Sequence, residues 1–124
     1  FQYTLDIMDT IYTIIYSPDG GHLLIAGADE SPRILDVTTG EEVSRLEGHR
    51  ENTGNIRFSR DGRFIVTGSA DRTMRVWDAE TGMELSLNAE HTAGVEEIEI
   101  SSDGTRVAST SWDTLIIWTP ALDK

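Results

Sequence analysis

The sequence repeats itself with a fixed period of 42 residues. Ser-x-Asp-Gly segments begin at Ser17, Ser59 and Ser101, 42 residues apart each time. Other residues keep the same spacing: Asp29, Asp71 and Asp113; Gly40 and Gly82; His49 and His91. A constant period near 40 residues indicates one structural unit made three times. We place the units at approximately 1–40, 41–82 and 83–124 and treat the chain as one segment of a repeat domain.

Each unit is expected to consist of short β-strands. In the second unit apolar residues alternate at Ile56 and Phe58, and Asp61-Gly62 follows as a turn before a second apolar segment at 64–66. Asp-Gly favours a hairpin because glycine adopts the positive φ that such turns need. Two more alternating segments, 73–77 and 83–87, flank a turn at Gly82. No segment keeps helical periodicity for three turns, so we predict an all-β fold with four antiparallel strands per unit.

Composition limits the partners and the setting. The chain has 22 acidic and 10 basic residues, a net charge of −12 and no cysteine. Binding to nucleic acid and to anionic membranes relies on lysine and arginine, so we expect neither partner. The acidic charge favours a basic protein partner, or serves solubility alone. The lack of cysteine does not indicate a redox compartment. We expect the protein in the cytoplasm. Because the chain begins with Phe1, we interpret it as a processed, trimmed or excised piece of a longer product.

The repeat unit has a family resemblance. The second unit contains Gly48-His49, then the Ser59 to Gly62 turn, then Gly68 to Asp71, and finally Val76-Trp77-Asp78. This pattern resembles the WD40 repeat in nearly every signature position. The third unit is similar but one residue shorter, because Asp113 and Trp118 are five positions apart instead of six. In the first unit Ile7 and Leu35 replace the signature His and Trp. The resemblance implies blades of a β-propeller.

The resemblance also implies a structural hydrogen-bond network in each blade, made by a His, a Ser or Thr, an Asp and a Trp. In the second unit these are His49, Ser69 or Thr67, Asp71 and Trp77. In the third unit they are His91, Ser111 or Ser109, Asp113 and Trp118. A buried indole N–H needs an acceptor, which gives the network a physical reason. In the first unit Asp29 lacks both partners, so we predict no network and a looser blade there.

A hydrolytic His-Ser-Asp triad is the competing interpretation of these residues. We reject it because two units repeat the same set, and because the sequence has no Gly-x-Ser-x-Gly elbow. We interpret His22 as a solvated turn residue. The Ser-x-Asp-Gly turns lack the run of oxygen ligands of a calcium loop. We therefore expect no enzyme activity, no cofactor and no metal.

Chain order predicts how the units assemble. A WD40 unit begins with the outermost strand of a blade, so the resemblance implies that 43–47 and the in-phase residues 1–5 are outermost strands. The chain stops soon after 115–118, which the resemblance makes a third strand. Propellers typically have roughly four to eight blades. We therefore expect three four-stranded blades per chain that close a ring by strand exchange between copies. We favour a nine-bladed trimer over a six-bladed dimer. The alternatives are a fragment of a larger seven- or eight-bladed domain and a regulatory propeller of a multidomain enzyme such as a kinase.

In this family the loops before the innermost strands form a binding face, which implies a protein-interaction scaffold. We expect Trp112 to be the main contact, because it lies in a tight turn and tryptophan is a frequent hot-spot residue. The alternative is that Trp112 packs against an adjacent blade. Glu96, Glu97 and Glu99 are interpreted as a solvated strand face. The comparable turn positions and a polar rim complete the predicted face: Ala28, Ala70, Arg50, Glu51 and Asn52.

Overall fold

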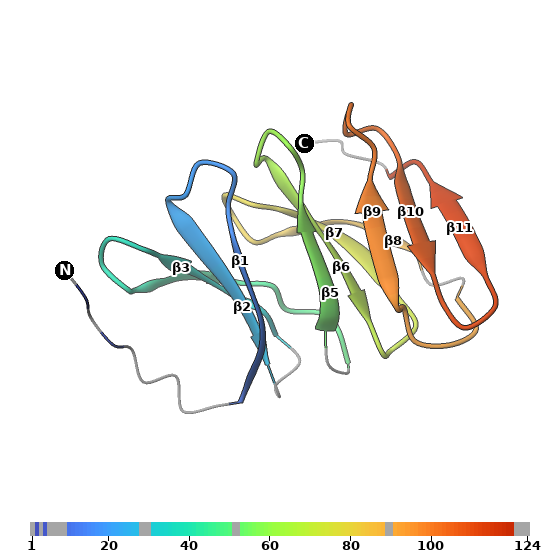
Figure 1. Ribbon diagram of the computed structural model, residues 1–124, viewed down its shortest axis with the longest axis horizontal. Coiled ribbons are helices and arrows are strands. Elements are labelled where there is room, and N and C mark those ends of the chain that lie inside the picture. The colour runs from blue at the N-terminus through green and yellow to red at the C-terminus, as the bar shows by residue number, and fades with distance from the viewer. Residues whose placement is uncertain are drawn as a thin grey trace.

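The computed structural model describes residues 2, 4, 10–27, 31–50, 53–88 and 91–120 of the chain. Over these residues it consists of three antiparallel β-sheets packed in a row (Figure 1). The all-β prediction is confirmed. The strands are β1 Ile11–Tyr16, β2 His22–Gly27, β3 Arg33–Asp36, β4 Glu42–Arg45, β5 Thr53–Phe58, β6 Phe64–Ser69, β7 Met74–Asp78, β8 Glu84–Asn88, β9 Glu97–Ile100, β10 Val107–Thr110 and β11 Leu115–Trp118.

The first two sheets have four strands each, in the orders β1-β2-β3-β4 and β5-β6-β7-β8. The third has three, in the order β9-β10-β11, so the expectation of a third four-stranded sheet is wrong for the described residues. The reason lies in the phase of the repeat: β4 and β8 open one 42-residue unit but complete the preceding sheet, and no described strand follows β11. The strand predicted at residues 1–5 falls outside the described residues.

The Ser-x-Asp-Gly segments build the same hairpin turn between the first two strands of each sheet. In the first turn the Ser17 hydroxyl donates to Asp19 Oδ1 over 2.7 Å and accepts the His22 N–H over 3.0 Å. Gly20 closes the turn at φ 74°, a conformation that costs glycine little. In the third turn hydrogen bonds from Ser101 and Thr105 lower the pKa of Asp103 to about 2. These residues repeat because the backbone of the turn needs them.

Two apolar clusters hold the three sheets together. Between the first and second sheets lie Leu24, Ile34, Ile56 and Trp77, all 2% exposed or less. Between the second and third sheets a similar cluster includes Val66, Val76 and Ile98. Figure 1 shows the resulting row, with the first sheet at one end and the third sheet at the other. The second sheet thus buries both faces, whereas the first and third sheets each bury one face against it.

Gly68 on β6 permits the close approach of the third sheet. A Cβ atom at Gly68 would lie 2.5 Å from Val95 Cγ1, a distance that real Cβ contacts do not show. The absence of a side chain there lets the segment before β9 pack directly on β6.

The third unit absorbs its missing residue in a turn and keeps its strand register. Trp118 pairs with Val107 in the third sheet just as Trp77 pairs with Ile65 in the second. In the second sheet the β6–β7 turn is closed by the Ser69 N–H bonding to Thr73 O, with Arg72 at φ 73° inside it. The β10–β11 turn is closed one residue sooner, by the Ser111 N–H bonding to Thr114 O. The shortening therefore affects only the turn.

Candidate functional site

The second unit contains a hydrogen-bonded chain of four side chains between the β4–β5 loop and strands β6 and β7. Asp71 Oδ2 lies 2.9 Å from His49 Nδ1, and His49 Nε2 lies 2.6 Å from Thr67 Oγ1. The indole N–H of Trp77 donates to the same Thr67 oxygen over 2.9 Å. Because an indole N–H can only donate, the Thr67 hydroxyl hydrogen is free to donate to His49 Nε2, which leaves the imidazole proton on Nδ1 facing the carboxylate.

The protonation states of this chain follow from burial and hydrogen bonding. Burial lowers the pKa of His49 below 6.5 and outweighs the opposite effect of Asp71, so the imidazole is neutral near pH 7. Burial raises the pKa of Asp71, but hydrogen bonds from Thr73, from the Arg50 N–H and from His49 outweigh it and hold this pKa well below its usual range. The Asp71 carboxylate is therefore ionised, and its oxygens accept hydrogen bonds from groups of the fold itself.

The structure settles which hydroxyl the second-unit chain contains. Thr67 Oγ1 bonds both His49 and Trp77. The Oγ of Ser69, which the sequence offered as the first choice, accepts the N–H of Asp71 over 3.1 Å. Ser69 lies at the end of β6, next to the turn, whereas Thr67 lies two residues earlier, opposite the imidazole. The assignment of Ser69 is corrected to Thr67 for this reason.

The third unit keeps only part of this arrangement. His91 Nε2 lies 2.7 Å from Ser109 Oγ, so Ser109 and not Ser111 is the hydroxyl partner. Within the described residues neither His91 Nδ1 nor Ser111 Oγ has a hydrogen-bond partner, although both atoms are buried. Asp113 is exposed and accepts a bond from the Thr114 hydroxyl instead. The short β10–β11 turn accounts for this, because it lacks the residue that lets Asp71 fold back on His49.

The remaining members of the third unit differ accordingly. Burial lowers the pKa of His91, and no carboxylate opposes the effect. Trp118 is half-buried and packs against the cluster between the second and third sheets, without a described hydrogen bond from its indole. Trp118 thus contributes packing rather than a donor to a network.

Trp112 occupies the tip of the short β10–β11 turn and is 85% exposed. It lines a shallow depression of about 410 Å³ between the second and third sheets. The β6–β7 and β10–β11 turns, which contribute to it, both lie at the lower end of the molecule in Figure 1. Ala70 from the β6–β7 turn lines the same depression. The other lining residues are Gly54, Ala93, Gly94, Val95 and Glu96. Of these seven lining residues, the sequence predicted Ala70 and Trp112 for the binding face. In the structure both line the same depression.

The small residues of the depression were not expected to form a site. Gly94 packs against the β6–β7 turn, where an added Cβ would lie 3.2 Å from Ala70 Cα. A Cβ on Gly54 would meet no atom within 4 Å, so open space lies above it. The sequence feature that could have predicted this depression is the Ala93-Gly94 pair shortly after His91. Small residues leave space beside a large side chain such as Trp112.

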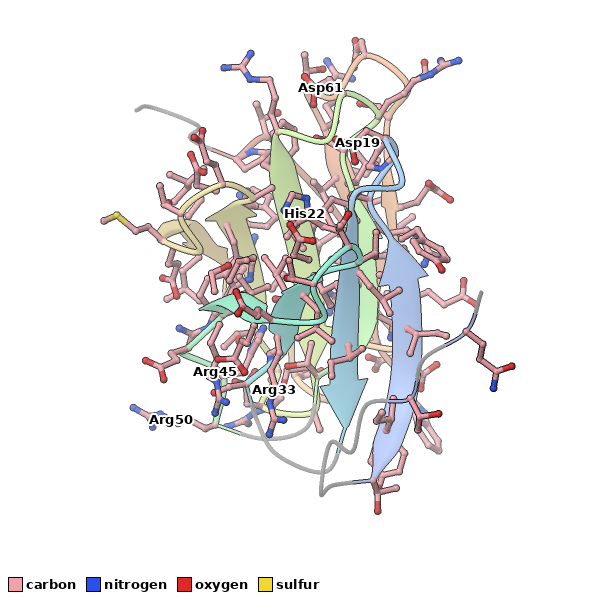
Figure 2. The ribbon with its side chains drawn as sticks, turned by 90° about the vertical axis from the view of Figure 1, so that its left-hand side faces the viewer. Asp19, His22, Arg33, Arg45, Arg50 and Asp61 are labelled. Atoms are coloured by element: carbon pink, nitrogen blue, oxygen red, sulfur yellow. The ribbon has the colours of Figure 1, made fainter. Side chains whose placement is uncertain are left out.

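The other predicted residues of this face are placed as follows. Arg50 is exposed, and its backbone N–H donates to Asp71 over 2.9 Å. Figure 2 shows Arg50, Arg33 and Arg45 toward the lower end of the molecule. Glu42 lies 3.8 Å from Arg33 and 3.0 Å from Arg45, which offsets their charge. Ala28, Asp29, Glu51 and Asn52 lie outside the described residues, so the predictions for them stay predictions.

The opposite end of the molecule carries a second cavity, of about 280 Å³, between the first and second sheets. Asp19 and Asp61, labelled at the upper end in Figure 2, line it together with His22. Both carboxylates already accept hydrogen bonds within their own turns. No group of three or more metal-ligating side chains occurs among the described residues. No helix in this part of the chain is long and apolar enough to cross a membrane.

The row of sheets and the repeated His, hydroxyl and Asp positions define a propeller-type repeat protein. The sequence profile of the family described as WD domain, G-beta repeat, matches residues 40–78 and 84–119. These segments cover more than half of the chain, and the protein belongs to the WD40 repeat family. The resemblance stated from the sequence is therefore confirmed.

Two solved structures show the same fold. The crystal structure of the RRP9 WD40 repeats and the structure of U3-55K each superpose with a TM-score of 0.84 at 20% sequence identity. Each comparison covers 93% of this chain but only 37% of the other chain. No curated protein matches the sequence. At this identity the likeness establishes the fold, and the chain spans little more than a third of the length of either structure.

Proposed function

We propose that this protein is a non-enzymatic protein-interaction scaffold of the WD40 type. The observation that carries the proposal is Trp112, whose side chain is 85% exposed beside a depression lined mainly by small and apolar residues. An exposed tryptophan next to a hollow is a typical anchor for a protein partner, because its large surface loses little conformational entropy on binding.

Catalysis is not proposed for the His-containing sets. His49 and Asp71 are bonded to structural partners, and their side chains are 0% and 6% exposed. A general base must reach its substrate within hydrogen-bond distance, and these groups face the interior.

The test compares partner capture by three immobilised chains: the native protein, Trp112→Ala and Met83→Ala. Met83 is the matched control, because it is 67% exposed but does not line the depression. We expect a defined set of proteins retained by the native chain and by Met83→Ala and lost with Trp112→Ala, as measured by quantitative mass spectrometry. Equal retention by all three chains would remove Trp112 from the interaction surface.

A second candidate function, self-assembly into a closed ring, is supported by the free edge of the third sheet. No described strand pairs with the outer side of β11, and Leu115 and Ile117 are exposed there. An unpaired strand edge is a ready template for a further strand. We propose that several copies close a ring, with a nine-bladed trimer favoured over a six-bladed dimer.

Light scattering after size exclusion, over a concentration series, tests the ring. A stable trimer or dimer mass is the expected result. A monomer that keeps its strand content would contradict the ring and favour a segment of a larger seven- or eight-bladed propeller, or a regulatory propeller of a multidomain enzyme such as a kinase. Cytoplasmic location and the absence of nucleic-acid or membrane partners remain part of the proposal. The net charge of −12 supports the absence of these two kinds of partner.

A further inference from the structure

The depression beside Trp112 combines an aromatic side with an acidic one. Glu96 lines it together with Trp112. Asp113 follows Trp112 in the turn. Both carboxylate residues are exposed, and neither forms an ion pair with another described residue. The Glu96 carboxylate is therefore unneutralised in the same depression as the exposed indole.

Positive charge from the chain itself is sparse at this place. Arg72 is exposed and belongs to the β6–β7 turn that contributes Ala70. Arg33, Arg45 and Arg75 belong to the first two sheets, where Glu42 and Glu84 pair with them. No basic residue is among the described residues that line the depression, and the whole chain has a net charge of −12. A cationic partner would be attracted both at long range and at the depression.

The Trp112 indole and the Glu96 carboxylate, which both line the depression, indicate which kind of cation would bind there. A flat indole face attracts a cation within about 6 Å of the ring centroid. A planar guanidinium also stacks on the ring, and its N–H groups match the two oxygens of one carboxylate. The depression has a volume of about 410 Å³ and is open to solvent, so a side chain of a partner can reach Trp112 and Glu96 from outside.

We infer that this depression binds an arginine side chain of a basic protein segment, with the guanidinium stacked on Trp112 and paired with the Glu96 carboxylate. The inference rests on the proposed interaction function and specifies the chemistry of the partner at that site. It uses only residues of the second and third sheets, so it does not depend on ring closure.

The test is an NMR titration of the ¹⁵N-labelled chain with three end-blocked pentapeptides: Gly-Ala-Arg-Ala-Gly and the same peptide with lysine or citrulline in place of arginine. The Trp112 indole N–H and the Gly94 and Glu96 amides report binding. We expect saturable shifts with the arginine peptide and binding at least about fivefold weaker for the other two. Citrulline keeps the shape without the charge, so equal binding by the citrulline peptide would overturn the inference. Equal binding by the lysine peptide would overturn the guanidinium assignment.

Variants distinguish binding at the depression from attraction of the peptide to the acidic chain as a whole. Trp112→Ala and Glu96→Gln are each expected to weaken arginine-peptide binding by about fivefold or more, read from the Gly94 amide. Glu99→Gln makes the same charge change at an exposed β9 residue that does not line the depression, and it should leave binding unchanged. An equal loss with Glu99→Gln would overturn the site. If arginine fails to bind while Trp112→Ala still abolishes partner capture, the scaffold function stands and only the cation assignment is wrong.

Discussion

Thr67 is the residue on which the buried hydrogen-bond chain of the second unit converges. Its oxygen lies 2.6 Å from His49 Nε2 and accepts the Trp77 N–H over 2.9 Å. Alternation along β6 places Thr67 and Ser69 on the same face of the strand, so the sequence pattern alone did not distinguish them. The distinction comes from distance along the strand, since only Thr67 lies deep enough to meet both rings.

Replacing Thr67 by valine keeps the shape and removes the hydroxyl. We expect Thr67→Val to lower the free energy of unfolding by about 1–3 kcal/mol, because two buried partners lose a hydrogen bond. Amide and indole hydrogen exchange should show the Trp77 N–H exchanging faster. Thr67→Ser is the control, because it retains the oxygen and should leave the indole protected. Equal protection of the indole in native chain and Thr67→Val would contradict the bridging role.

The two buried histidines predict a pH dependence of stability. Burial lowers the pKa of both His49 and His91 below 6.5 in the folded chain. Between the folded and unfolded values the unfolded state binds more protons, so the free energy of unfolding falls as pH drops through about 6.5. Urea unfolding at pH 7.5 and 5.5 should therefore give a lower midpoint at pH 5.5. An unchanged or higher midpoint at pH 5.5 would show that burial does not keep these rings neutral.

At the scale of the element, the 42-residue spacing predicted the hairpin turns and the strands they join. It did so because Ser-x-Asp-Gly dictates local hydrogen bonds that need no tertiary context, such as Ser59 to Asp61 Oδ1 over 2.7 Å. The spacing between Asp113 and Trp118 showed that a residue was missing but left the third-sheet register open. Packing decided it, because keeping Trp118 opposite Val107 preserves the apolar face toward the second sheet.

Restoring the length of the β10–β11 turn should complete the third-unit network. We propose inserting a glycine directly after Asp113, in the place that Arg72 holds at φ 73° in the second unit. Asp113 would then reach His91 Nδ1, which has no partner among the described residues, and add about 1 kcal/mol to the free energy of unfolding. NMR titration should show the pKa of His91 rising relative to the native chain. The same insertion combined with Asp113→Asn is the control, and a similar rise there would rule out the carboxylate as its cause.

At the scale of the whole molecule, the two end sheets expose faces that the inner packing buries. Ile56 and Ile98 insert between sheets and are 2% and 3% exposed, whereas Ile14, 42 residues before Ile56, is 62% exposed. On the third sheet Ile117 is 69% exposed, although Val76 at the same register in the second sheet is fully buried. A second copy could therefore dock its first sheet on the third sheet in the way the sheets dock within one chain.

Two residues oppose this docking. Gly68 makes room for Val95, but the third sheet has Thr110 at that register, and a docked copy would place Ile11 against it. Asn55 donates to the backbone oxygens of Val95 and Glu96, but Glu97 stands at that position in the third sheet and cannot donate when ionised. Strand order alone predicted ring closure. How well the first sheet of one copy fits the third sheet of another depends on individual residues such as Thr110 and Glu97, which strand order does not consider.

We therefore expect the double variant Thr110→Gly, Glu97→Asn to self-associate at least about tenfold more tightly than the native chain, a difference of about 1.4 kcal/mol. The first change removes a steric conflict and the second restores a donor for two carbonyl oxygens. Sedimentation velocity over a concentration series measures the change, with circular dichroism checking that the strand content is kept. Adding Ile14→Asp to the double variant should abolish the gain, because the charge would be buried at the docked face. Association that is unaffected by all three substitutions would mean that copies meet through another surface, and that the two end faces do not contact each other.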